Sequence, residues 1–65
     1  MDKNLLEYEM KKAGISIAEM CEILEISRSA FYRKCNGISD FTQTEIAKIM
    51  EVLKVNNPVP IFFAN

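Results

Sequence analysis

The sequence predicts an all-α fold, a compact bundle of four to five short helices, and three observations support this. Apolar residues recur at intervals of three and four, which is the period of an α-helix. No segment alternates between apolar and polar residues for long enough to form a strand. Gly14, Gly37 and the cluster at residues 56–58 divide the chain into segments of helical length. The 65 residues correspond to a single domain, 1–65, and 49% hydrophobic residues with 26% charged residues are typical of a folded chain.

The first helix is expected over residues 4–13, because Leu6, Met10 and Ala13 are spaced by four and three residues. Two lysines stand in its last turn, where cations are favourable, and Gly14 follows as a glycine stop.

The next two helices are expected to follow each other closely. Ser16 and Glu19 have the spacing of a capping box, which opens a second helix with room for about two and a half turns before Ser27. Ser27 is itself a favourable N-cap, and residues 28–36 contain no Gly, Pro or acidic residue before Gly37, so they predict a third helix. The apolar stripe of the second helix consists of Ile17, Met20, Cys21 and Leu24.

Two further starts are expected in the second half of the chain. Thr42 and Glu45 repeat the capping-box spacing and open a fourth helix. Asn57 followed by Pro58 has the pattern of an N-cap and a first helical residue, which predicts a short fifth helix or a turn. The residues expected to form the core, including two that should anchor the loop before the fourth helix, are Leu6, Met10, Ile15, Met20, Leu24, Ile26, Phe31, Ile38, Phe41, Ile46, Ile49, Met50, Leu53 and Ile61.

Phe62 and Phe63 are adjacent, and two neighbouring aromatic side chains cannot both point inward from a helix. At least one is expected to be exposed, either covering the edge of the core or available to a partner subunit. Residues 54–65 are therefore the candidate dimerisation segment.

The composition argues against an enzyme, a metal site and a bound cofactor. The chain has no His, which excludes an imidazole as general base, general acid or metal ligand. Cys21 and Cys35 fit no zinc or redox spacing, so they are expected to be reduced thiols in a cytoplasm. Neither a secretory leader in residues 1–26 nor a membrane span is expected, and no small-molecule ligand is evident.

A basic segment is hidden in an acidic chain. The net charge is −1, yet residues 27–37 carry +3 and no acid, which leaves −4 (−1 minus +3) for the other residues. At about 100° per residue, the polar residues of the third helix fall within an arc of about 140°, opposite Ala30 and Phe31. Such a face is either the solvated side of an ordinary helix or a surface that enters the major groove of DNA, where Arg forks to guanine. The residues of this arc are Arg28, Ser29, Tyr32, Arg33 and Asn36.

Residues 16–37 resemble the helix-turn-helix unit of the lambda repressor and Cro family. Residues 16–21 (Ser-Ile-Ala-Glu-Met-Cys) are similar to its first helix, and residues 24–27 (Leu-Glu-Ile-Ser) to its turn. The run Ile-Ser-Arg-Ser-x-Phe-Tyr-Arg-Lys-x-Asn-Gly at residues 26–37 is similar to the recognition helix of small phage and prophage regulators. The resemblance spans nearly the whole chain, because residues 40–42, 45–46 and 61–63 also fit the pattern.

The resemblance implies that the third helix enters the major groove while the helix before it crosses the DNA backbone. It implies base contacts from Arg28, Ser29 and Arg33, and a phosphate contact from Asn36. Tyr32 would reach base methyl groups or phosphate. The candidate DNA-binding residues, together with the helix-capping Ser27 and its backbone amide, are Ser27, Arg28, Ser29, Tyr32, Arg33 and Asn36.

Four positions depart from the family pattern. Ile17 stands where Gln is frequent, which removes a phosphate or base contact, and Cys21 replaces a small Ala as a buried thiol. Glu25 stands at the position of a left-handed Gly, which should cost about 1 kcal/mol if the same backbone is kept. Lys34 replaces an apolar residue, and we expect its stem to pack on the core while its amino group reaches out.

The function implied by the resemblance is a sequence-specific transcriptional regulator of phage or prophage type, most simply a repressor. It would bind a palindromic operator in double-stranded DNA as a homodimer, in the cytoplasm or nucleoid. The alternative is the same fold used as a protein-interaction module, an antirepressor or an assembly partner, which the negative net charge favours. No catalysis is implied.

Overall fold

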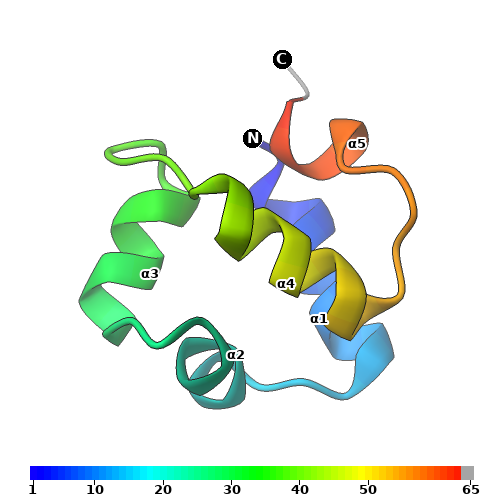
Figure 1. The fold of residues 1–65 in the computed structure, drawn as a ribbon, viewed down its shortest axis with the longest axis horizontal. Coiled ribbons are helices and arrows are strands. Elements are labelled where there is room, and N and C mark those ends of the chain that lie inside the picture. The colour runs from blue at the N-terminus through cyan, green and yellow to red at the C-terminus, as the bar shows by residue number, and fades with distance from the viewer. Residues whose placement is uncertain (64–65) are drawn as a thin grey trace.

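A computed structural model describes residues 1–63, which form five helices joined by short loops (Figure 1). No strand occurs within these residues, so the predicted all-α bundle is confirmed, with five helices rather than four. The last two residues of the predicted dimerisation segment, 64 and 65, lie outside the described residues. The helices are α1 (Lys3–Ala13), α2 (Ile17–Leu24), α3 (Arg28–Cys35), α4 (Gln43–Leu53) and α5 (Val59–Phe62).

Three helices begin as predicted, each at a hydroxyl side chain that accepts a backbone N–H. Ser16 and Thr42 complete the capping boxes of α2 and α4, with Glu19 and Glu45 accepting the N–H of the cap residue in return. Ser27 Oγ accepts a backbone N–H of the first turn of α3 at 3.1 Å. Because these contacts satisfy amides that have no partner inside the helix, the start of each helix is set locally.

Two helices begin one residue away from the prediction. α1 starts at Lys3 because the Asp2 carboxylate accepts the Leu5 N–H at 3.0 Å, a cap that the sequence analysis missed. α5 starts at Val59 rather than Pro58, although the predicted Asn57 side chain still accepts the Val59 N–H at 3.1 Å.

Three helices end at a residue in the left-handed conformation. Gly14 (φ 72°) ends α1, which confirms the predicted glycine stop. Glu25 (φ 58°) ends α2 and Lys54 (φ 57°) ends α4, and each donates its N–H back to the last turn of its helix. A side chain with a Cβ is strained in this conformation by about 1 kcal/mol, so Glu25 adopts the left-handed conformation expected at its position and carries the strain.

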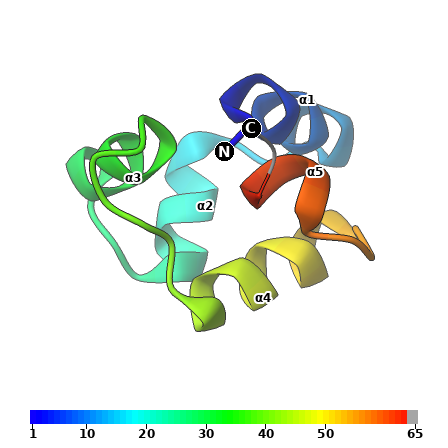
Figure 2. The same ribbon diagram turned by 90° about the horizontal axis from the view of Figure 1, so that it is seen from above.

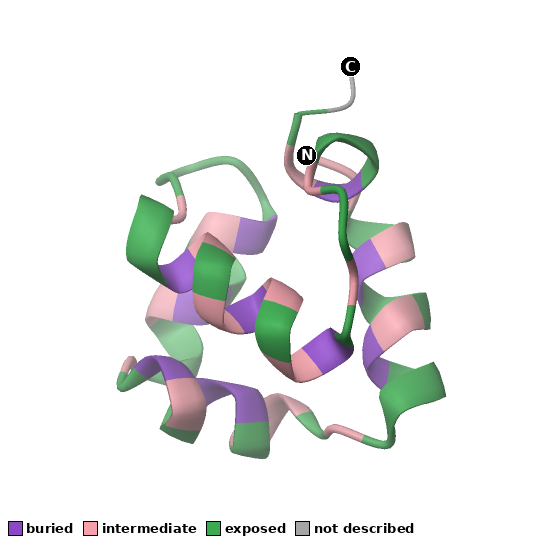
Figure 3. Ribbon diagram, turned by 45° about the vertical axis from the view of Figure 1, so that its right-hand side comes forward, coloured by how far each residue is buried: buried purple, intermediate pink, exposed green. Residues whose placement is uncertain are grey.

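The helices enclose a single core. α1 packs against α4 and α5, and α2 packs against α3 and α4 (Figure 2). The Asp2 N–H donates to the Ile61 carbonyl at 2.6 Å, which holds the start of α1 beside α5. Figure 3 shows the buried residues on the sides of the helices that face each other. The buried hydrophobic residues are Leu6, Met10, Met20, Cys21, Leu24, Phe31, Cys35, Ile49, Leu53 and Ile61.

Most of the predicted core is confirmed, with three differences. Ile38 is 74% exposed, and the loop after α3 is held instead by its backbone, since the Ile38 N–H donates to the Arg33 carbonyl at 2.9 Å. Cys35, which the predicted core left out, is buried. The predicted core residues that are only half-buried are Ile15, Ile26, Phe41, Ile46 and Met50.

Aromatic side chains connect the loop before α4 to α3 and α5. The Phe41 ring lies edge-on to Phe31, with centroids 6.0 Å apart, and to Phe62, with centroids 5.6 Å apart. Phe41 therefore anchors this loop, as expected. Phe63 is 61% exposed while Phe62 is half-buried, so the two adjacent aromatic residues do divide between surface and core.

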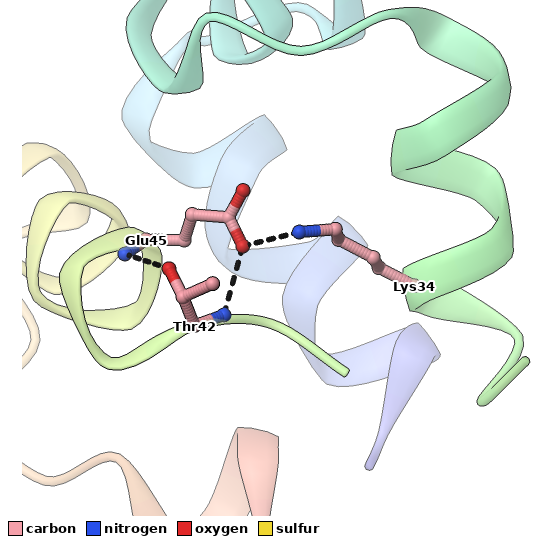
Figure 4. Close-up of polar contacts among 3 residues, drawn as sticks. All are labelled: Lys34, Thr42 and Glu45. Atoms are coloured by element: carbon pink, nitrogen blue, oxygen red, sulfur yellow. Dashed lines mark hydrogen bonds and ion pairs between the residues drawn. The ribbon is translucent and has the colours of Figure 1, made fainter. Parts of the chain in front are cut away.

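A buried ion pair joins α3 to α4. Lys34 Nζ donates to Glu45 Oε1, and the same oxygen accepts the Thr42 N–H at 2.8 Å (Figure 4). The two charged side chains are only 14% and 11% exposed. The expectation that the amino group of Lys34 reaches out is therefore wrong, because the capping box aims the Glu45 carboxylate at α3 and gives this ammonium a buried partner.

The protonation of Glu45 reflects two opposing influences. Burial raises the pKa of its carboxyl, but the hydrogen bond and charge of Lys34 and the Thr42 N–H stabilise the carboxylate and lower the pKa below its ordinary value overall. Glu45 therefore contributes stability above the pKa of the unfolded chain, and this contribution is lost as the pH falls through the lower pKa of the folded chain.

The left-handed ends of the helices predict changes in stability of opposite sign. Glu25→Gly should raise the free energy of unfolding by about 1 kcal/mol, because glycine removes the strain at φ 58°. Gly14→Ala should lower it by about the same amount, since a Cβ there meets no atom within 4 Å and only the backbone conformation opposes it. Urea unfolding followed by circular dichroism measures both. The control is Glu22→Gly, inside α2, which should lower the free energy of unfolding by about 1 kcal/mol.

The ion pair predicts a stability difference that depends on pH. Lys34→Met should lower the free energy of unfolding by about 3 kcal/mol at pH 7, because it leaves the Glu45 carboxylate buried without its cation. The loss should shrink as the pH falls toward the lowered pKa of Glu45 in the folded wild type, and should be smallest below it, where the carboxyl is neutral in both proteins. Urea unfolding at a series of pH values measures this difference.

The matched control for this variant is Lys48→Met. Lys48 lies 3.9 Å from a Glu25 carboxylate oxygen, with side chains 42% and 83% exposed, and pairs of this kind contribute about 1 kcal/mol or less. Equal losses in the two methionine variants would show that the buried ion pair contributes no more stability than the exposed one.

Candidate DNA-binding surface

α3 buries one face and exposes the other. Phe31 and Cys35, one turn apart, are 3% and 7% exposed and anchor the helix against the core. Ala30 is half-buried beside them. The residues of the predicted polar arc are all exposed, as is the capping Ser27 at the start of the helix, and we call this set the α3 face: Ser27, Arg28, Ser29, Tyr32, Arg33 and Asn36.

The residues of the α3 face differ in which hydrogen-bonding groups and charges are not already engaged within the protein. Ser27 Oγ already accepts the N–H of Ala30, which leaves the O–H and the backbone N–H of Ser27 as donors. Neither Arg28 nor Arg33 forms an ion pair with another described residue, which leaves both guanidinium groups available. Tyr32 is 48% exposed, and its ring packs edge-on against Phe31 with centroids 6.2 Å apart.

The positive charge of the α3 face comes from arginine. Lys34 is on the same helix, but its ammonium is neutralised by Glu45 inside the protein. A planar guanidinium can form two parallel hydrogen bonds to one base edge, whereas an ammonium acts as a point charge. The exposed charges of α3 are therefore those suited to reading bases.

A groove of about 380 Å³ separates α1 from α3. Tyr32 and Asn36 of the α3 face line one wall, and Lys3 and Lys11 of α1 line the other. Ile17, which stands where the family pattern has Gln, is half-buried and also lines the groove. Nothing local in the sequence shows which face of α1 lies beside α3, so these two lysines were missed.

The two cysteine side chains lie in the hydrophobic core. Cys21 and Cys35 are buried free thiols, and burial raises the pKa of the Cys35 thiol to about 11, so it stays protonated at neutral pH. Residues 1–63 contain no cluster of three groups that could hold a metal ion. None of the helices in that range is long and apolar enough to cross a membrane.

The family comparison agrees with this geometry. A family model described as Cro/C1-type HTH DNA-binding domain matches residues 5–58, which include α2, α3 and α4 in full. Searches of curated proteins and of solved structures find no match. The match covers most of the chain, and within it two short helices meet at a left-handed turn and expose a basic, polar face. The chain therefore belongs to the Cro/C1-type helix-turn-helix DNA-binding domains, and DNA is its partner.

Proposed function

We propose that the chain is a sequence-specific transcriptional regulator of phage or prophage type, a repressor that binds a palindromic operator as a homodimer in the cytoplasm or nucleoid. The observation that carries the proposal is the α3 face, where two arginines with no ion-pair partner among residues 1–63 stand with polar and aromatic side chains, while Phe31 and Cys35 of the same helix are buried. An α-helix with this division fits the major groove of B-DNA.

The residues of the α3 face would have separate tasks. Arg28 and Ser29, in the first turn, would contact base edges, as would Arg33 about one turn further on. Tyr32 would reach a thymine methyl group or a phosphate. Asn36 and the backbone amide of Ser27 would bind phosphate and fix the register of the helix on the duplex.

A homodimer is supported by the exposed apolar side chains of the C-terminal segment. Val59, the first residue of α5, is 53% exposed, and Phe63, which follows the helix, is 61% exposed. A second copy of the chain would cover them and would place two α3 helices one turn of DNA apart.

The alternative function, a protein-interaction module, rests on two other features. The exposed glutamates of α2, Glu19 and Glu22, would favour a basic partner over DNA on that side. Ile38, on the loop after α3, is 74% exposed and would offer an apolar contact to a protein partner outside the proposed dimer segment.

The test is selection of duplex DNA from a random pool with the purified chain. We expect enrichment of a palindrome with half-sites about 10 base pairs apart. Arg28→Ala should then lose about 1 to 3 kcal/mol of binding free energy and relax the base preference at one position in each half-site. Lys12→Ala, in the last turn of α1 and 3.8 Å from a Glu9 carboxylate oxygen, is the matched control and should bind like the wild type.

Failure of the selection would overturn the proposal. If no sequence is enriched and Arg28→Ala leaves the residual DNA binding unchanged, the α3 face does not read bases. Loss of a protein partner on the same substitution would then favour the interaction module.

A further inference from the structure

We propose that α1 extends the DNA-binding surface: Lys3 and Lys11 bind the phosphate backbone beside α3, and Lys3 also positions Asn36. The inference rests on the proposed function, because it assigns further contacts to the same DNA complex.

The contact between Lys3 and Asn36 links the two helices at the surface. Lys3 Nζ donates to Asn36 Oδ1 at 3.2 Å, and both side chains are exposed. With its carbonyl oxygen engaged, the Asn36 carboxamide has its NH₂ group left to offer, which can only donate hydrogen bonds. Phosphate oxygens can only accept them, so Lys3 holds Asn36 in the orientation that suits a phosphate. The ammonium of Lys3 retains two further N–H groups for the same anion.

Lys11 lies two helical turns further along the same groove. The groove also contains Tyr32 and Asn36 and so continues the α3 face. A DNA strand whose backbone runs along α3 would therefore pass the α1 wall of the groove. Neither Lys3 nor Lys11 forms an ion pair with a described residue, which leaves both charges for an external anion.

Other charges on α1 divide the helix into two faces. Lys12, the next residue, lies 3.8 Å from a Glu9 carboxylate oxygen and faces a different hollow, lined by Val52 and Lys54 at the end of α4. Glu7 stands between the two groove lysines on the same wall. Its carboxylate would repel a phosphate, so it limits the affinity that the groove can reach.

The salt dependence of DNA binding tests the proposal. Wild type, Lys3→Ala, Lys11→Ala and Lys12→Ala are titrated with the selected duplex between about 50 and 200 mM salt. Each groove variant should flatten the slope of log K against log salt by about 0.9, the loss of one phosphate contact, without changing the preference among sequences. Lys12→Ala is the matched control and should keep the wild-type slope. Glu7→Gln should bind more tightly.

A double-mutant cycle isolates the positioning role of Lys3. Asn36→Ala should weaken binding in the wild type, but much less in Lys3→Met, where the carboxamide has already lost its orientation. Lys3→Arg, which keeps a charged donor, should retain most of the Asn36 effect. Independent effects of the two substitutions would overturn the positioning role.

The two proposals can fail separately. If Arg28→Ala behaves as expected but Lys3→Ala and Lys11→Ala keep the wild-type slope, as the control Lys12→Ala does, the α1 contact is wrong and the proposed function stands. If the wild type binds no duplex at all, both are wrong.

Discussion

The carboxylate of Glu45 is the group on which the arrangement of α3 and α4 depends. One of its oxygens accepts both the Thr42 N–H, which begins α4, and the ammonium of Lys34, which belongs to α3. Removing two charges from water costs several kcal/mol for each, and only close, well-satisfied contacts offset this cost. The pair therefore tolerates little movement, and the orientation of α3 is fixed to the same atom that caps the next helix.

This fixed orientation decides which charges of α3 remain outside. The ammonium of Lys34 is buried, while Arg28 and Arg33 stay exposed and form no ion pair with any residue that the structure describes. The exposed lysines that share the groove with Tyr32 and Asn36, Lys3 and Lys11, come from α1. In the proposed complex, guanidinium groups that form paired hydrogen bonds would face base edges, and ammonium groups that act as point charges would flank them on the backbone. Specificity and affinity would then come from different helices.

How much the sequence could predict depends on the range of each interaction. Ser16, Ser27 and Thr42 were identified as caps because their partners lie three residues away, and the α3 face follows from the helical period alone. The burial of Glu45 and of the Lys34 head depends on a contact between two helices, so local pattern treats one as a capping residue and the other as a surface charge. The lysines beside α3 were missed for the same reason, since the packing of α1 decides which of its faces meets α3.

The left-handed residues Glu25 and Lys54 also bear on the lifetime of the protein. Together they lower the free energy of unfolding by about 2 kcal/mol relative to glycine at both positions, which corresponds to a roughly 30-fold larger unfolded fraction. Proteases cleave the opened chain, and when opening is fast the rate of degradation follows the population of that state. Where degradation takes this route, the strain at the two helix ends would shorten the lifetime of the protein in the cell, and its concentration would follow its synthesis more closely.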